Sequence, residues 1–343
     1  MKIPDIDLAY AHGGPCGTGK IRHVAEDFRV IEIPGFEPDG QGDHVYLTIE
    51  KKDLTTQAVS NRLRDYCQVK SRDVGYAGMK DRHAVTRQNF SINLAGKSEP
   101  DWAALVSENL KVLAVSRHPR KLKKGVLKGN RFELVVRDMS ADHDCLQNRL
   151  QKISQQGVPN YFGDQRFGIE GKNLDKAAVL FSGENIHIDR HERGMLFSSV
   201  RSKLFNALLA ERVSQHNWHR LLAGEVISLD GTARHFHEPI DDILIERAER
   251  LDVHGTGPLP GLESRAIEPD DEAGKVEQHV MQHYADWLEG LQRFKLEHAR
   301  RPLRVAVRDL QWSIEEDQLF LSFSLTAGAY ATVVLREILA VTQ

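Results

Sequence analysis

A change of sequence pattern at Gly157, reversed near residue 303, restricts the folds open to this 343-residue chain. Before Gly157, apolar and polar residues alternate in short runs bounded by Gly- and Pro-rich turns, as in strands with one buried face. The predicted strands are 24–33, 43–51, 88–94 and 131–137. The predicted helices are 55–67 and 141–156. The first part of the chain therefore mixes strands with helices.

After Gly157 the spacing of apolar residues becomes mainly helical. The predicted helices are 173–181, 198–216, 242–251 and 275–300. Between the last two, residues 253–261 are rich in Gly and Pro and are predicted to be irregular. Strands return at 303–307 and 319–325, and a final helix is predicted over 329–341.

The two ends of the chain thus share one α+β pattern, and a helix-rich block separates them. This arrangement predicts an inserted domain rather than two domains in tandem. We expect one domain to comprise residues 1–155 and 304–343, and the inserted domain to comprise residues 156–303. No internal repeat or low-complexity segment is evident.

The charge is unevenly distributed, although the net charge is only −3. Residues 111–131 contain eight Lys or Arg and no acid, whereas residues 238–289 contain fourteen acids and four Lys or Arg. A basic block of this kind can contact phosphates, or can simply be a solvated face. Gly125, Gly129, Asn130 and Phe132 interrupt or follow it, and such residues suit a splayed nucleotide. RNA binding is the prediction for the basic block.

Several classes of protein are disfavoured. No apolar run approaches the roughly 20 residues of a membrane span, and the first residues do not resemble a signal peptide. The three cysteines are far apart and form no CxxC pair, so neither a zinc site nor a disulfide framework is expected. The His and Asp groups at 142–145 and 235–238 lack metal-site spacing and are predicted to lie on the surface. We expect a cytoplasmic monomer without a membrane partner or a metal.

A phosphate-binding loop is also disfavoured. Residues 14–20 fit the spacing G-x-x-x-x-G-K, but Ile21 follows where Ser or Thr would hold magnesium. The residues after Lys20 are patterned as a strand, whereas such a loop opens a helix. No nucleotide cofactor is therefore expected.

Asp81 is the strongest candidate for a catalytic residue. It lies between Lys80 and Arg82 and follows Gly75 and Gly78, in a loop between a predicted helix and a predicted strand. A nearby cation keeps a carboxylate ionised, and glycines allow a bulky ligand to approach the backbone. Such an acid can act as a nucleophile on a polyanionic substrate. The alternative is a polar surface turn in which Asp81 pairs with its neighbours.

Five ordered motifs carry a resemblance to a known family. They are Pro15–Arg22 running on to Glu26-Asp27-Phe28-x-Val30, Gly78-x-Lys80-Asp81-x-x-Ala84-Val85-Thr86-x-Gln88, Leu127-Lys-Gly-Asn130-Arg-Phe132, the segment 157–168, and the segment 323–337. Their residues and order resemble the TruD-type tRNA pseudouridine synthases over nearly the whole chain. The resemblance implies a pseudouridine-synthase catalytic core with a mixed or antiparallel sheet, interrupted by a helix-rich α/β insertion called the TRUD domain.

The resemblance also implies an activity and a site. The expected reaction is isomerisation of uridine to pseudouridine in tRNA, at position 13 of the D arm, without a cofactor. Asp81 matches the catalytic residue, either as a nucleophile at C1′ or as a base at C2′ of the ribose. Phe28, Asn130 and Tyr330 match residues that contact the substrate, and Phe132 matches an aromatic of the Gly-Asn-x-Phe segment. Arg22 and Lys80 are expected to orient the carboxylate or to meet phosphate.

Two residues depart from the family pattern. Thr326 and Ala329 stand where the last motif usually has Pro and Ser, so a proline constraint and a hydroxyl are missing. The expected turn can still form around Gly328. Two other functions compete with the synthase hypothesis: a non-catalytic RNA-binding or RNA-folding protein on the same scaffold, and a nucleoside hydrolase or glycosidase. The last usually needs two carboxylates or a metal-bound water, and only Asp81 is convincing.

Overall fold

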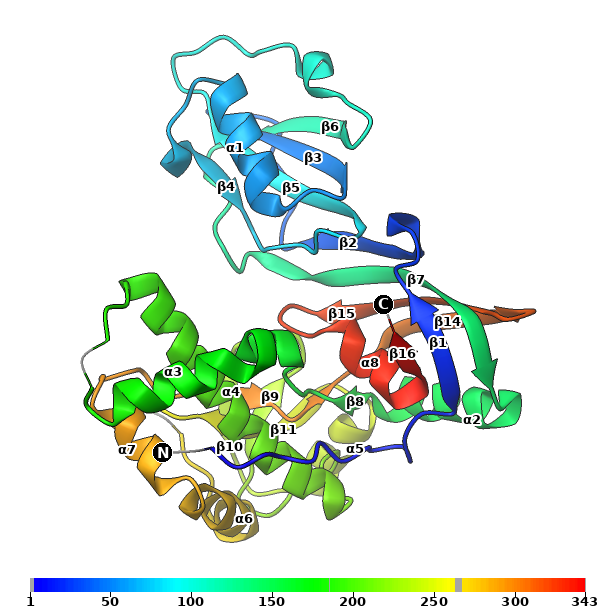
Figure 1. Cartoon of the computed structure of the whole chain (residues 1–343), viewed down its shortest axis with the longest axis vertical. Helices are drawn as coiled ribbons and strands as arrows, with labels where there is room; N and C mark the ends of the chain where they lie inside the picture. Colours follow the sequence, from blue (N-terminus) through cyan, green and yellow to red (C-terminus); the bar gives the residue numbers. More distant parts are fainter. Residues whose placement is uncertain (1–2, 185, 263–266, 343) are drawn as a thin grey trace. The chain divides into compact units, whose positions relative to one another are not determined.

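The computed structural model describes residues 3–184, 186–262 and 267–342 (Figure 1). The chain divides into two compact units, each built from separate segments. Unit 1 comprises residues 1–15, 143–307 and 329–338, and unit 2 comprises residues 16–142, 308–328 and 339–343. The domain boundaries expected from the sequence, at 155/156 and 303/304, stay a prediction.

Unit 2 is built on one large sheet. Its strands are β1 (Gly17–Ile21), β2 (Phe28–Pro34), β3 (His44–Lys52), β4 (Val74–Tyr76), β5 (Val85–Asn93), β6 (Leu110–His118), β7 (Leu127–Ala141), β14 (Arg308–Glu315), β15 (Gln318–Thr326) and β16 (Ala340–Thr342). The main order is β14-β15-β7-β2-β5-β3-β6. β2 is parallel to β5 and β1 to β16, while the remaining pairs are antiparallel. The sheet is therefore mixed, as predicted.

The long strand β7 and the helix α1 (Thr56–Tyr66) organise this sheet. β7 pairs with β2 along one edge and with β15 along the other, which brings three distant segments of the chain side by side (Figure 1). The Thr55 side chain caps α1 by accepting a hydrogen bond from the amide of Ala58. Val59 and Leu63 of α1 are fully buried in a core cluster with residues of β3 and β5. Burial of this apolar face holds α1 against the sheet.

Unit 1 contains most of the helices. They are α2 (His143–Gln156), α3 (Lys172–Phe181), α4 (Arg190–Ser214), α5 (Asp242–Glu249), α6 (Asp271–Gln282), α7 (Ala285–Gln292) and α8 (Ala331–Ile338). A four-stranded sheet has the order β10 (His235–His237), β9 (Val226–Leu229), β11 (Val253–Leu259), β12 (Ala299–Pro302), and β8 (Val158–Pro159) pairs with β13 (Arg304–Val305). Fourteen of the 25 residues of α4 are buried, so this helix runs through the core of the unit (Figure 1).

The segment predicted to be irregular, residues 253–261, is instead mostly the strand β11, so that prediction was wrong. Its glycines serve close packing rather than turns. A Cβ on Gly255 would lie 2.8 Å from the Glu225 carboxyl carbon, and one on Gly257 would lie 3.1 Å from Phe205. Glycine in a strand often marks such a close approach.

Two predicted helices end earlier than expected. The helix predicted over 275–300 is divided into α6 and α7, and β12 follows. The buried residue Tyr284 lies between the two helices with non-helical dihedral angles, φ −122° and ψ 23°. The last helix ends at Ile338, and the chain continues as β16. Tertiary packing and strand pairing decide these ends, and neither is visible in local periodicity.

The predicted strand character after Lys20 is confirmed, because Gly17–Ile21 is β1 and pairs with β7. Cys67 is buried and has a free thiol, whereas Cys16 and Cys145 are disulfide-bonded. The expectation that the cysteines form no disulfide was therefore wrong for these two, because wide spacing in the sequence does not show which residues the fold brings together. Within the described ranges, no helix is both long and apolar enough to cross a membrane.

Candidate active site

Asp81 lies in the loop between β4 and β5, and side chains of α1 and β5 fix this loop. The amide of Lys80 donates to the hydroxyl of Thr56 at 2.9 Å, and Thr56 donates to the Gln88 side-chain oxygen at 2.8 Å. The Gln88 amide group donates to the carbonyl of Gly78 at 3.2 Å. Thr56 and Gln88 are almost completely buried. The backbone that leads into the candidate acid, at Gly78 and Lys80, is thus anchored to rigid elements.

Arg22 contacts the Asp81 carboxylate. Its Nη2 lies 3.2 Å from Asp81 Oδ2, and the Arg22 and Asp81 side chains are 15% and 44% exposed. The guanidinium carbon also lies 4.1 Å from the ring centroid of Phe28, in a cation–π contact. Arg22 has a left-handed backbone, φ 60°, which is uncommon for a residue other than glycine. Ring and carboxylate together orient the guanidinium, and the carboxylate stays accessible.

Lys80 forms an ion pair that the sequence did not predict. Its ammonium lies 2.9 Å from Glu32 Oε2, and the two side chains are 4% and 1% exposed. The other carboxylate oxygen of Glu32 accepts from the Asn89 amide at 3.1 Å. A buried cation with this partner is a poor phosphate ligand. The contacts favour a role in holding the loop next to Asp81.

Lys51 is a second residue that the sequence analysis missed. It is fully buried on β3, and its ammonium donates to the carbonyl oxygens of Asp81 at 2.9 Å and of Leu54 at 2.5 Å. Burial lowers the pKa of Lys51 from 10.5 to about 8, against the opposing effect of the Asp81 charge. A sequence signal exists: Val45, Leu47, Ile49 and Lys51 alternate along β3, so Lys51 shares the buried face.

The predicted aromatic residues form a cluster on the same sheet. Phe28 and Phe132 are 2% and 5% exposed, with ring centroids 6.4 Å apart, and Phe132 stacks on Phe323 at 5.5 Å. Both predicted residues are therefore largely core aromatics. The face of Phe28 is covered by the Arg22 guanidinium.

Two of the polar atoms that are buried without a hydrogen-bond partner among the described residues belong to residues predicted for the site. They are Arg22 Nε and Asn130 Oδ1. Asn130 lies on β7 opposite Glu32 of β2, and Leu325 of β15 is its partner on the other side. Buried polar groups are usually satisfied, so an unsatisfied donor and acceptor near a candidate acid indicate a place for a ligand. The structure thus brings Arg22, Phe28, Lys80, Asn130 and Phe132 to the sheet that carries Asp81.

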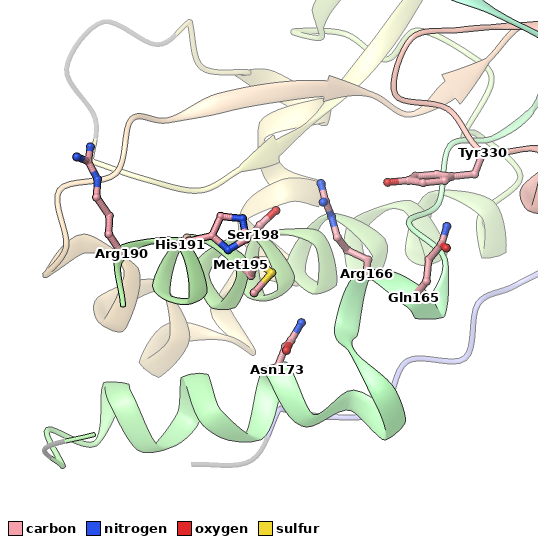
Figure 2. Close-up of a pocket in the computed structure, with 9 residues that line it drawn as sticks. Gln165, Arg166, Asn173, Arg190, His191, Met195, Ser198 and Tyr330 are labelled. Carbon is pink, nitrogen blue, oxygen red and sulfur yellow. The ribbon is translucent and has the colours of Figure 1, made fainter. Parts of the chain in front are cut away.

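Tyr330, the remaining predicted residue, belongs to unit 1 and immediately precedes α8. Its ring is half-buried and makes an edge contact with Phe162 at 6.5 Å. The turn before it contains Gly328 with φ 84°, so the expected turn forms without the family's proline. Tyr330 lines a cavity of about 850 Å³ in unit 1 (Figure 2). We call this cavity the α4 groove; its lining residues are Gln165, Arg166, Asn173, Arg190, His191, Gly194, Met195, Ser198 and Tyr330.

The remaining expectations concern metals and the basic block. No group of three metal-ligating side chains occurs within residues 3–184, 186–262 and 267–342. The basic block contributes β6 and the loop before β7, where Lys121 donates to the carbonyl of Arg72 and Lys124 lies over Tyr76. Most of its cations are exposed, as phosphate binding requires.

Comparison with known proteins identifies the family. The model of the family "tRNA pseudouridine synthase D (TruD)" matches residues 7–178 and 185–338. The chain belongs to the TruD family. A tRNA pseudouridine synthase D of Methylococcus capsulatus is 46% identical over 334 residues, covering 97% of this chain and 94% of the relative. One from Nitrosococcus oceani is also 46% identical, covering 96% and 93%.

A crystal structure shares the fold. It is that of a putative tRNA pseudouridine synthase D from Methanosarcina mazei, with a TM-score of 0.71 and 22% identity, covering 96% of this chain and 95% of that one. The expected α+β TruD fold is therefore confirmed. The roles expected for Asp81 and its neighbours from the TruD motifs stay predictions.

Proposed function

We propose that this chain isomerises uridine to pseudouridine in tRNA, at position 13 of the D arm, and that Asp81 acts on the ribose. Relatives that are 46% identical over almost their whole length bear the name tRNA pseudouridine synthase D. The observation that carries the proposal is the accessible Asp81 carboxylate, held by Arg22 on an anchored loop. We further propose a monomer that acts in the cytoplasm, where tRNA is available.

The reaction is an internal rearrangement. The N1–C1′ bond of the uridine breaks, the uracil turns, and a C5–C1′ bond forms as C5 loses its proton to N1 or to solvent. No electrons or atoms are gained overall, so the chemistry requires no redox or group-transfer cofactor. Asp81 can attack C1′ directly or remove a proton from C2′, and both routes begin from the same carboxylate.

The substrate uridine must leave its base stack before Asp81 can reach the ribose. The unpaired atoms Arg22 Nε and Asn130 Oδ1 supply a donor and an acceptor for the extruded nucleotide. We propose that Asn130 reads the uracil and that Arg22 moves between the carboxylate and the incoming nucleotide. Phe28 and Phe132 shape the apolar floor beneath them. Lys80 acts through Glu32 and the loop. Separately, Tyr330 in unit 1 offers a ring on which a base of the tRNA can stack.

Mutation of Asp81 tests the proposal. Asp81→Asn keeps the shape of the side chain and removes its charge, so we expect pseudouridine formation to fall at least about a thousandfold. The affinity for tRNA should change little. Asp53→Asn is the matched control, because Asp53 is a similarly exposed acid that makes no contact with Asp81. Pseudouridine is mapped by mass spectrometry after derivatisation of an unmodified tRNA.

Each outcome has a clear meaning. Pseudouridine at position 13 with the wild type and Asp53→Asn, but not with Asp81→Asn, would support the reaction, the position and the acid together. Salt-sensitive tRNA binding without any conversion would favour a non-catalytic RNA-binding protein. Release of free uracil would favour a hydrolase.

A further inference from the structure

The α4 groove is cationic and has no acidic residue in its lining. Arg190 and His191 are exposed, and neither makes a side-chain hydrogen bond or ion pair with another described residue. Arg166 uses its Nε to contact Ser202 at 3.3 Å and places its guanidinium 5.1 Å from the Phe162 ring centroid. Its two terminal amino groups have no hydrogen-bond partner within the described ranges. The groove therefore offers unneutralised donors to an anion.

One face of α4 forms the long side of the groove. Residues 190, 191, 194, 195 and 198 recur at helical spacing, so they share this face. From Arg190 to Ser198 the helix advances about 12 Å, which exceeds the roughly 3.4 Å between stacked nucleotides and leaves room for more than one nucleotide. Figure 2 shows Arg190 at one end of the groove and Tyr330 at the other, with Arg166 beside Tyr330. The phenol oxygen of Tyr330 points along the groove toward Arg166.

Gly194 keeps the middle of the groove open. A Cβ built on Gly194 would meet no heavy atom within 4 Å, and the residue lies inside a helix, where glycine is unfavourable. Local helix stability therefore does not explain this glycine. Met195, also exposed, and the half-buried Ser198 continue the same surface. The result is a long trough with cations, a flexible apolar side chain and an aromatic ring.

We propose that the α4 groove binds a single-stranded segment of the substrate RNA, with phosphates at Arg190 and Arg166 and a base against Tyr330. The inference rests on the proposed function for its substrate and adds a second binding region to it. Separated arginines, an open length of more than one nucleotide and a ring at one end suit a strand better than a compact metabolite. A single-stranded segment also fits proteins that read RNA through unstacked bases.

Charge changes on α4 test this inference. Arg190→Ala should weaken tRNA binding by roughly tenfold in moderate salt, and lower the salt slope of the affinity by about one phosphate contact. Arg193→Ala is the matched control, since Arg193 is an exposed arginine on the same helix but outside the groove. Its affinity and slope should stay close to those of the wild type. Filter binding at four or five salt concentrations measures both quantities.

A second pair of variants tests the groove without removing any contact. Gly194→Glu places a carboxylate in the open middle of the groove and should weaken tRNA binding more than Arg190→Ala does. Gly194→Lys adds similar bulk with the opposite charge, so its affinity should be well above that of Gly194→Glu. Circular dichroism checks that both variants retain the helical content of the wild type.

Several results would overturn the inference. Equal effects of Arg190→Ala and Arg193→Ala would show a diffuse electrostatic effect rather than a site. Normal tRNA binding by Gly194→Glu, with orthophosphate or uridine monophosphate still bound by the wild type, would assign the groove to a small anion. The proposed function would survive either result if the wild type forms pseudouridine. Conversely, groove-dependent tRNA binding without conversion would leave the groove assigned and the isomerase proposal rejected.

Discussion

Charged residues near Asp81 differ from those of the α4 groove in burial and in pairing. Near Asp81, Lys80 is buried with Glu32, and Lys51 is buried with two carbonyl oxygens as acceptors. In the α4 groove, Arg190 is exposed and makes no such contact with a described residue. Buried, paired charges fix geometry, whereas exposed charges attract a polyanion and respond to salt. In our proposals, the first region positions the catalytic loop and the second binds RNA.

The largest expected effect tests whether the buried Lys80–Glu32 ion pair holds the region around Asp81 in place. Lys80→Met removes the cation and leaves the Glu32 carboxylate buried beside the Asn89 amide. A buried charge without its partner is strongly destabilising, so the free energy of unfolding should fall by about 3–5 kcal/mol. Chemical denaturation followed by circular dichroism measures it.

Lys52→Met is the control for this variant. Lys52 pairs with Glu26 at 2.7 Å, but both side chains are more than 40% exposed. Removal of this exposed pair should cost at most about 1 kcal/mol. Equal losses of unfolding free energy in Lys80→Met and Lys52→Met would mean that the buried pair stabilises the fold no more than an exposed pair does.

Much of the α+β pattern could be predicted from the sequence, because alternation and turns report which face of a strand is buried. The strands β2, β3, β5 and β7 and the helix α1 follow this rule. The strand β11 could not be predicted in this way. Its glycines look like turn residues, and only the neighbouring Glu225 and Phe205 show that a Cβ has no room.

The sequence indicated the candidate acid of this site but not the contacts that hold its loop. Asp81 stands in a motif, and Arg22, which a second motif singled out, lies in contact with it. Lys80 and Glu32 are 48 positions apart in the sequence. Their contact depends on the parallel pairing of β2 with β5. Lys51 stands in a charged run that resembles a solvated strand end. Only its alternation with Val45, Leu47 and Ile49 indicates burial.

The pH dependence of stability tests the burial of Lys51. Its folded-state pKa of about 8 lies below the ordinary 10.5, so between these values the unfolded chain holds a proton that the folded chain has lost. The unfolding free energy should therefore rise with pH in this window, by on the order of 1 kcal/mol per pH unit. Below pH 8 the cost of burying the ammonium is fully present. Asp81 opposes the shift, whereas Lys80 adds to it.

Lys51→Met isolates this contribution. Other lysines and tyrosines titrate in the same window, so the measured quantity is the wild-type curve of stability against pH minus that of the variant. We expect this difference to increase from pH 8 to pH 10.5. Parallel curves would mean that the Lys51 ammonium is hydrated in the folded protein, and the region around Asp81 would then be less rigid than its contacts indicate.

The smallest expected effect compares one substitution in the two regions. Gly194→Ala in the α4 groove adds a methyl group to open space inside a helix, so the free energy of unfolding should rise by about 0.5–1 kcal/mol. Gly75→Ala, ahead of the Asp81 loop, would place its Cβ 2.3 Å from the Leu122 carbonyl oxygen and should destabilise the protein. Thermal denaturation measures both changes. A higher Tm for Gly194→Ala and a lower Tm for Gly75→Ala would confirm that the groove is open at Gly194, whereas the Asp81 region is close-packed at Gly75. If Gly194→Ala also destabilises, some part of the chain already fills the groove, and a strand of RNA would have to displace it.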